Sequence, residues 1–222
     1  MLEVIALSLD DALRAEVGGA TRLEVTCAIE QDGLTPPLDL VERILAHVRI
    51  PIRVMLRPRD SFAIADADEL DEICAQACVL AALPIDGLVL GWLRASAVDV
   101  SALRAIAAVA PHLQFTFHRA VERAADIDAA LDALRTIPQV DTILHSGGAT
   151  LPDVARIAML RDLHTRCAAH DFTLLAGGGL NAALIARLRR ETFVCAFHLG
   201  RAVRRGGKWE GVVEMEGIVN GE

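Results

Sequence analysis

The stretch QFTFHRA at residues 114–120 decides how the whole chain is interpreted. Its first four residues alternate polar and apolar side chains, and this alternation predicts a short buried strand. The strand ends directly in His118 and Arg119, before the acidic start of a helix. Chemistry-bearing side chains at the carboxyl end of a strand are typical of α/β proteins, which bind their ligands at that edge. The stretch therefore predicts an α/β fold with a functional rim.

The same pattern of an apolar run, a polar turn and an amphipathic helix recurs along the chain. The predicted strands are residues 2–7, 22–26, 51–56, 87–90, 114–117, 141–144, 172–176 and 194–199. The predicted helices are residues 10–17, 37–48, 66–83, 101–109, 126–136 and 152–167, with a seventh after Asn181. Ser101 and Asn181 are the expected N-caps of their helices, because their side-chain oxygens accept hydrogen bonds from free backbone N–H groups.

Strict alternation of strands and helices requires parallel strands joined by crossover helices. Eight such units close into a TIM-type (β/α)8 barrel, whereas an open doubly wound sheet usually has fewer strands. No change in composition divides the chain, so residues 1–222 are expected to form a single domain. Only residues 201–222 follow the last strand, and glycines interrupt them, so the eighth helix is predicted to be short or missing. An apolar wall left open there predicts a homo-oligomer.

Composition argues against several classes of partner. The 222 residues carry a net charge of −8, and 53% of them are hydrophobic. An acidic chain without a basic tract is not expected to bind nucleic acid. No apolar run reaches the roughly 18 residues of a membrane span, and residues 1–9 contain Glu3 and no basic residue, so no signal peptide is expected. Five scattered cysteines give no disulfide framework, and we expect a cytoplasmic protein with reduced thiols.

Glu24 and His118 are the candidate catalytic residues. Glu24 lies between two apolar residues of a buried strand, where a carboxylate is costly unless it is paired. It is either part of a structural ion pair with Arg57 or Arg119, or a catalytic acid, base or metal ligand. His118 stands at the rim, where a neutral imidazole serves as a metal ligand or a general base. The alternative for His118 is a histidine that is merely hydrogen-bonded in the core.

An anionic ligand is expected near three arginines at strand carboxyl ends. Arg57, Arg59 and Arg119 concentrate positive charge in an acidic chain, and guanidinium groups bind carboxylates and phosphates through paired hydrogen bonds. Two glycine-rich turns before helices fit the same ligand, because they expose backbone N–H groups at helix N-termini. The ligand-binding residues predicted in these turns are Ser146, Gly147, Gly178 and Gly179. Glycine in such a position also serves simply to make the turn tight.

The metal-binding candidates are His118, His198 and Cys27, which lie near strand carboxyl ends. Cys74 and Cys78 stand four residues apart on one helix, but their apolar neighbours predict that they pack against the barrel. The chain has no CxxC motif and no methionine cluster. These residues by themselves therefore do not define a copper site.

Several short stretches of the chain resemble the CutC family, a group of α/β-barrel proteins named for a proposed role in copper homeostasis. The stretches are RLEV at 22–25, DGLTP at 32–36, LRPR at 56–59, FTFHRA at 115–120, LHSG at 144–147, AGGG at 176–179 and FH at 197–198. They follow one another from the second strand to the eighth, and the LTP, RPR and TFHRA motifs are specific in combination. The chain departs from the family pattern at Ala6, Leu7 and Thr26, where many members carry cysteines.

The resemblance implies a single α/β barrel in a cytoplasmic, oligomeric protein that binds copper. It also implies a rim site built from Glu24, Arg57, His118, Arg119 and His198. Three functions stay open at this point. The chain is a copper-binding or copper-trafficking protein, an enzyme that acts on a small carboxylated or phosphorylated substrate by acid–base chemistry, or a subunit whose rim residues are structural.

Overall fold

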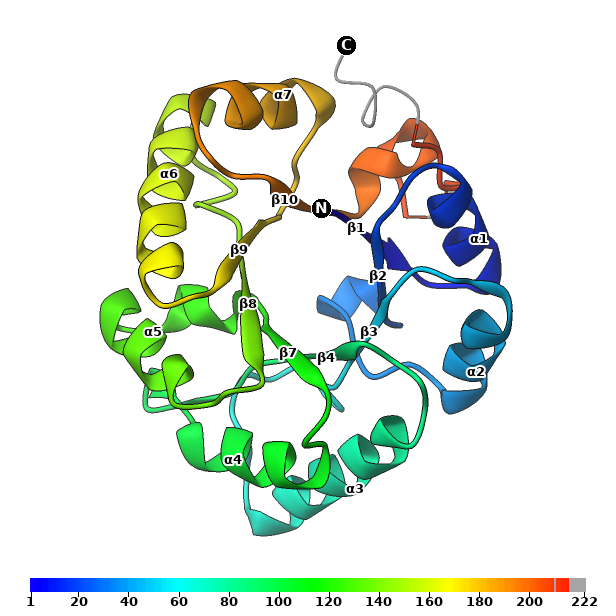
Figure 1. Cartoon of the computed structure of the whole chain (residues 1–222), viewed down its shortest axis with the longest axis vertical. Coiled ribbons are helices and arrows are strands. Elements are labelled where there is room, and N and C mark those ends of the chain that lie inside the picture. Colours follow the sequence, from blue (N-terminus) through cyan, green and yellow to red (C-terminus); the bar gives the residue numbers. More distant parts are fainter. Residues whose placement is uncertain (210, 216–222) are drawn as a thin grey trace.

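Eight parallel strands close into a barrel in the computed structural model, which describes residues 1–209 and 211–215. Around the barrel the strand order is β1, β10, β9, β8, β7, β4, β3 and β2, and helices surround this ring (Figure 1). The strands are β1 (Leu2–Ala6), β2 (Arg22–Val25), β3 (Ile52–Met55), β4 (Gly87–Leu90), β7 (Gln114–Phe117), β8 (Val140–His145), β9 (Thr173–Ala176) and β10 (Ala196–Leu199). The predicted TIM-type barrel is confirmed, and each strand lies where the alternation of apolar residues predicts it.

Seven α-helices cover the outside of the barrel within the described part of the chain. They are α1 (Leu9–Val17), α2 (Leu38–His47), α3 (Ala67–Ala81), α4 (Val100–Val109), α5 (Ile127–Arg135), α6 (Asp153–Ala169) and α7 (Ala182–Glu191). Asn181 caps α7 as predicted, by accepting a hydrogen bond from the N–H of Leu184. The prediction that Ser101 caps α4 is wrong. Asp99 is the N-cap, and its carboxylate accepts hydrogen bonds from both the N–H of Ala102 and the hydroxyl of Ser101.

A small hairpin between β4 and α4 was not predicted. It consists of β5 (Leu93–Arg94) and β6 (Ala97–Val98), which pair antiparallel. The two turn residues Ala95 and Ser96 both have positive φ, at 49° and 63°. Neither is a typical residue for that conformation, which explains why the sequence pattern does not reveal the turn.

The segment after β10 forms two short 3₁₀ turns in place of an eighth helix, η3 (Arg201–Val203) and η4 (Arg205–Gly207). This segment closes the gap between α7 and α1 (Figure 1). Its apolar side chains Val203, Val213 and Met215 are buried, and the guanidinium of Arg204 pairs with Asp11 of α1 at 2.8 Å. The prediction of a missing eighth helix is confirmed for the described residues; residues 216–222 lie outside them.

Strand residues face two separate apolar layers. Outward-facing residues such as Leu23, Val54 and Leu88 pack with the helices in one large core. Leu144, Leu175 and Ala196 form a small separate cluster, which alternation assigns to the barrel interior. No described helix is long and apolar enough to cross a membrane.

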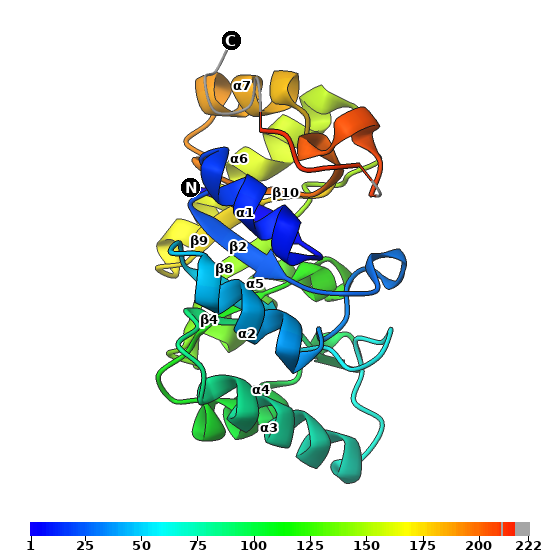
Figure 2. The same cartoon turned by 90° about the vertical axis from the view of Figure 1, so that its right-hand side faces the viewer.

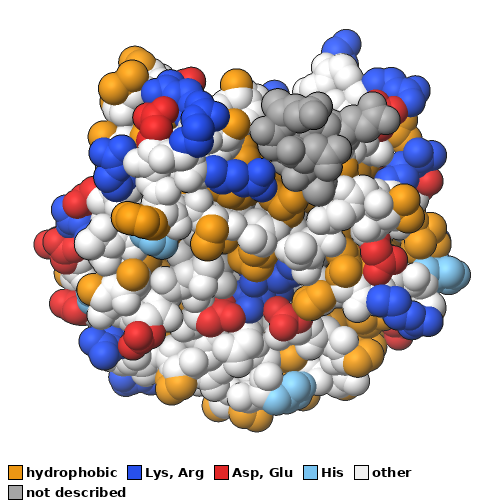
Figure 3. Space-filling model, turned by 45° about the horizontal axis from the view of Figure 1, so that its top comes forward, with side chains coloured by type: hydrophobic (Ala, Val, Ile, Leu, Met, Phe, Trp, Pro, Cys, Tyr) orange, Lys and Arg blue, Asp and Glu red, His pale blue; other side chains and the backbone are white. Residues whose placement is uncertain are grey.

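The two ends of the barrel differ in what they expose. The loops at the carboxyl ends of the strands, with η1 (Ile29–Gln31) and the segment after β10, protrude on the right of Figure 2. On the opposite face, seen in Figure 3, acidic side chains flank basic ones in a central hollow. At this amino-terminal end the buried Arg53 binds Asp86 and Asp141, at 2.8 Å and 2.6 Å.

Candidate functional site

A cavity of about 710 Å³ opens at the carboxyl ends of the barrel strands. Three strand residues, Ile5, Met55 and Leu144, give it an apolar floor. Its ionisable lining residues are Glu24, Asp32, Arg57, His118, Arg119, Glu122, Arg123, His198 and Arg201. Glu24, Arg57, His118, Arg119 and His198, which the sequence assigned to strand carboxyl ends, thus line one cavity, because the strands are parallel and deliver their following residues to one face.

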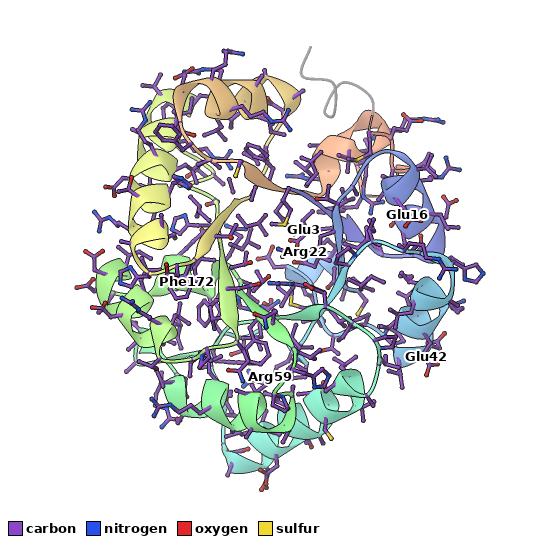
Figure 4. All side chains as sticks on the ribbon, in the orientation of Figure 1. Glu3, Glu16, Arg22, Glu42, Arg59 and Phe172 are labelled. Carbon is purple, nitrogen blue, oxygen red and sulfur yellow. The ribbon has the colours of Figure 1, made fainter. Side chains whose placement is uncertain are left out.

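Glu3 connects two buried basic side chains beneath this cavity. Its carboxylate accepts a hydrogen bond from Arg22 Nε at 2.5 Å and one from His198 Nδ1 at 2.7 Å. Figure 4 shows Glu3 and Arg22 inside the ring of strands. Burial opposes ionisation, but the hydrogen bond from His198 and the charge of Arg22 outweigh it, so the pKa of Glu3 falls to about 2. Glu3 is therefore a permanent anion at neutral pH.

Glu24 lies at the floor of the cavity with no strong partner. His198 Nδ1 is 3.9 Å from Glu24 Oε2, and the carboxylate of Glu3 also lies within 4.8 Å of this group. Glu24 Oε2 is buried and has no hydrogen-bond partner among the described residues. Burial raises the pKa of Glu24 to about 7, with the charge of Glu3 as a further cause and His198 opposing both. Glu24 thus exchanges its proton near neutral pH.

His198 lies between the two carboxylates, 2.7 Å from Glu3 and 3.9 Å from Glu24. Burial works against its charge, but the charges of Glu24 and Glu3 and the hydrogen bond to Glu3 raise the pKa of His198 above its ordinary value. The predictions named Glu24 and His198 separately. The alternation of the first strand was the only signal for Glu3, and nothing in the sequence shows that these three side chains meet.

His118 presents a buried N–H group at the cavity wall. Its Nδ1 accepts a hydrogen bond from the backbone N–H of Ala120 at 3.2 Å, so Nδ1 carries no proton. Burial, and to a smaller extent the charge of Arg57, lowers the pKa of His118 to about 3, so the ring is neutral. The proton therefore resides on Nε2, which is buried without a partner among the described residues. This state favours a hydrogen-bond donor over a general base.

Close packing fixes the orientation of the His118 ring. A Cβ atom on Gly91 would lie 2.6 Å from Nδ1, so only glycine leaves room for the imidazole there. On its other side the ring contacts Phe62, with ring centroids 5.2 Å apart. Phe62 also packs under the guanidinium of Arg57, 5.0 Å from its centroid. One aromatic ring thus holds both Arg57 and His118.

Arg57 is anchored through its two terminal nitrogens. Nη1 donates to the carbonyl oxygens of Gln31 and Gly33, and Nη2 pairs with Asp60. Its Nε is buried and has no partner among the described residues. Arg57 therefore shapes the loop after β2 and still retains one unused N–H.

The other two predicted arginines behave differently. Arg119 lines the cavity and pairs with Glu122 at 2.9 Å. Arg59 does not line the cavity, because its guanidinium binds Glu69 at the start of α3. The prediction that Arg57 or Arg119 pairs with Glu24 is wrong, since each has another acidic partner.

Only one of the two predicted glycine-rich turns lines the cavity. Gly178 and Gly179 line the cavity, and their φ values of 71° and 73° suit glycine. Ser146 and Gly147 do not line it: the Ser146 hydroxyl accepts hydrogen bonds within its own turn, and Gly147 packs against Leu160.

Several residues of the site were not predicted. Arg156, a buried arginine of α6, ties the two glycine turns together by donating to the carbonyl oxygens of Ser146, Gly177 and Gly178. Arg123 and Arg201 are exposed residues at the cavity mouth, and neither forms an ion pair with a described residue. Trp209 adds an aromatic wall. These residues follow turns or lie on a helix, where the sequence carries no sign of their destination.

The predicted copper ligands do not converge. His118 and His198 both line the cavity, but Cys27 lies in a separate groove beside α2 and α3, where its Sγ donates to the carbonyl oxygen of Thr35. The proton on His118 Nε2 blocks that atom, and moving it to Nδ1 would set it against the N–H of Ala120. One imidazole beside two carboxylates remains, a set that lacks the soft ligands Cu(I) prefers. These residues do not fit a Cu(I) ion.

The structure defines the class of this protein: a TIM-type barrel with ionisable groups around a cavity at the carboxyl ends of its strands. The CutC family model matches residues 1–203. Two relatives named as family protein CutC support the match. That of Xylella fastidiosa strain Temecula1 is 33% identical over 89% of this chain and 73% of its own length. That of Xanthomonas campestris pv. campestris is 34% identical over 89% and 81%. The chain belongs to the CutC family.

A solved structure shares the fold. The CutC protein of Streptococcus agalactiae, which is named for copper homeostasis, superposes with a TM-score of 0.81. It is 24% identical, and the match covers 90% of this chain and 97% of that one. This likeness confirms the barrel.

Proposed function

We propose that this protein is an enzyme that transfers protons on a small organic anion, with Glu24 as the proton-transfer group. One observation carries the proposal: a buried carboxyl with an unpartnered oxygen and a pKa near 7 lies at the floor of an open cavity. Acid–base catalysis is most effective when the catalytic pKa is near the working pH. Perturbed carboxyl groups of this kind concentrate in active sites.

The charge of the cavity supports an anionic substrate. Arg123 and Arg201 stand at the mouth without acidic partners among the described residues, and the chain as a whole is acidic. Gly178 and Gly179 also line the cavity, and the backbone N–H groups of their turn are further hydrogen-bond donors for an anion. A carboxylate or a phosphate is the ligand group that such arginines and amides bind.

The test is a screen of small carboxylates and phosphate monoesters at pH 7, with conversion followed by proton NMR. We expect one compound to be converted by the wild type and by Glu42→Gln, a control at an exposed position on α2 (Figure 4). Glu24→Gln should bind that compound and convert it about 10²- to 10⁴-fold more slowly. Equal conversion by Glu24→Gln, or no compound bound by the wild type, would falsify the proposal.

Copper binding is the second candidate, and the name of the Streptococcus agalactiae relative supports it. Against it stand the distance of Cys27 from the cavity and the protonated Nε2 of His118. A Cu(I) titration of the reduced protein against a competing chelator tests this candidate. We expect no competition. Tight one-to-one binding that is lost in His118→Ala would establish the copper role instead.

We also propose that the protein is a cytoplasmic homo-oligomer. All five cysteines are free thiols, which suits a reducing compartment. Val17 and Phe193 are large apolar residues with more than four-fifths of their surface exposed, at the ends of α1 and α7. Light scattering after size exclusion should give a multiple of the 23.8 kDa chain mass. A monomeric mass would exclude the oligomer.

A further inference from the structure

Two buried N–H groups without partners lie at the same wall of the cavity. They are Nε of Arg57, which follows β3, and Nε2 of His118, which follows β7. Both residues line the cavity, and both are at least 96% buried. A buried donor without an acceptor costs about 1–3 kcal/mol, so two such donors side by side call for an explanation.

Phe62 joins these two donors into one unit. Its ring contacts the guanidinium of Arg57 and the imidazole of His118, at 5.0 Å and 5.2 Å between centres. The remaining polar atoms of both side chains are already bound, to Asp60 and two carbonyl oxygens in one case and to the N–H of Ala120 in the other. Neither side chain is free to turn away and find water.

Glu24 lines the same cavity as this pair. It belongs to β2, the neighbour of β3, which Arg57 follows; β3 and β4 separate it from β7, which His118 follows. The part of a ligand that reaches Glu24 also meets the apolar side chains of Ile5 and Leu144. These apolar side chains suit a C–H group of the ligand next to Glu24.

We infer that Arg57 and His118 form an oxyanion site, and that the substrate is a carbonyl compound whose neighbouring C–H proton is removed by Glu24. The inference rests on the proposed function and names its substrate class. One positive and one neutral donor suit a carbonyl oxygen that becomes negatively charged, because donors fixed in a buried site stabilise such charge without reorganisation.

The step needs no further reactant. The carboxylate of Glu24 takes the proton, the C–H bonding pair becomes a C=C bond, and the carbonyl π pair moves to the oxygen. This oxygen accepts the hydrogen bonds from His118 Nε2 and Arg57 Nε. Return of the proton from Glu24 to the same carbon restores the carbonyl compound.

Oxalate, a planar dianion that mimics the enolate of a 2-oxo acid, is the binding probe, measured by calorimetry. His118→Phe keeps the aromatic packing and removes the donor. His145→Phe is the matched control, because His145 also accepts a backbone N–H bond through Nδ1, from Gly147 two residues on, and does not line the cavity. Oxalate affinity should fall by about 10- to 100-fold in His118→Phe and stay at the wild-type value in His145→Phe.

Arg57→Lys keeps the charge without Nε–H and should also weaken oxalate binding, in a protein whose circular dichroism matches the wild type. Equal affinity in His118→Phe and His145→Phe, or no oxalate binding to the wild type, overturns the inference. The second arm follows exchange of the substrate's C–H protons in D₂O. Exchange that needs both Glu24 and His118 supports the inference, and conversion without deuterium incorporation overturns it.

The second arm also separates this inference from the proposed function. A compound that Glu24 converts without C–H exchange leaves an enzyme of another reaction class. Conversion that survives Glu24→Gln removes the proposed function itself.

Discussion

Arg53, at one end of the barrel interior, and the cavity residues at the other end are buried polar groups that differ in how fully they are hydrogen-bonded. At the amino-terminal end, Arg53 is 2% exposed and donates hydrogen bonds to Asp86, Asp141 and Thr116. At the carboxyl end, Glu24, Arg57 and His118 each retain a buried polar atom without a partner among the described residues.

This difference distinguishes the ion-pair network around Arg53 from the proposed site around Glu24. Buried polar groups are normally hydrogen-bonded, and those around Arg53 follow that rule. Unpartnered groups are tolerated where a ligand completes them, and those around Glu24 line a cavity. A buried charged residue inside the barrel therefore does not by itself indicate a functional site. A buried polar atom that lacks a hydrogen-bond partner and lies beside an open cavity is better evidence for one.

The largest expected effect lies between the two ends, at Glu3. Glu3→Gln leaves the buried side chains of Arg22 and His198 without their anionic partner and should lower the free energy of unfolding by about 3–5 kcal/mol at pH 7. The pKa of Glu3 is depressed to about 2, so its contribution is present above pH 4.5 and is lost as pH falls toward 2. Urea unfolding at pH 7 and pH 3 checks this. A deficit as large at pH 3 as at pH 7 would contradict it.

At the amino-terminal end, Arg53→Met should lower the free energy of unfolding by about 2–3 kcal/mol. The loss is smaller because Asp86 and Asp141 are about a third exposed and regain water. Ligand affinity, measured by calorimetry with oxalate, should stay unchanged. A loss of oxalate binding in the folded variant would show that the two ends are coupled.

At the carboxyl end, Glu24→Gln should stabilise the fold by about 1–3 kcal/mol at pH 8. The pKa of Glu24 is raised to about 7, so the folded state holds the proton more tightly than the unfolded chain, and stability is lost as pH rises from 4.5 through 7. The variant keeps its neutral side chain and avoids this loss. Thermal unfolding at pH 8 and pH 4.5 should show the gain only at pH 8. If Glu24→Gln were instead less stable than the wild type at pH 8, ionised Glu24 would stabilise the fold, and the prediction would be wrong.

The smallest expected effect is at the cavity mouth. Arg123→Ala combined with Arg201→Ala should leave the melting temperature unchanged and weaken oxalate binding about fivefold at low salt. Arg104→Ala, at an exposed position on α4, is the control and should change neither. Weakening that persists unchanged in high salt would show that these arginines act by contact rather than by their field.

The architecture was predictable because it depends on local pattern. Apolar runs such as residues 87–90, each followed by a helix, demand parallel strands, and eight of them close a barrel. The same pattern brings Glu24, Arg57, His118, Arg119 and His198 to one face without any knowledge of contacts. The hairpin β5–β6 was missed because Ala95 and Ser96 adopt a backbone conformation that their side chains do not signal.

The sequence by itself thus determined the barrel and the set of residues at its rim. Only the tertiary structure decided which of these residues find hydrogen-bond or ion-pair partners. Glu3 and His198 are 195 positions apart and meet because β1 pairs with β10 when the barrel closes. That closure gives His198 a carboxylate partner, whereas Glu24 Oε2 has no hydrogen-bond partner among the described residues. Arg57 and Arg59, two residues apart, likewise separate because one points into the barrel mouth and the other reaches α3. Pairings across a closed sheet depend on register, which no local pattern records.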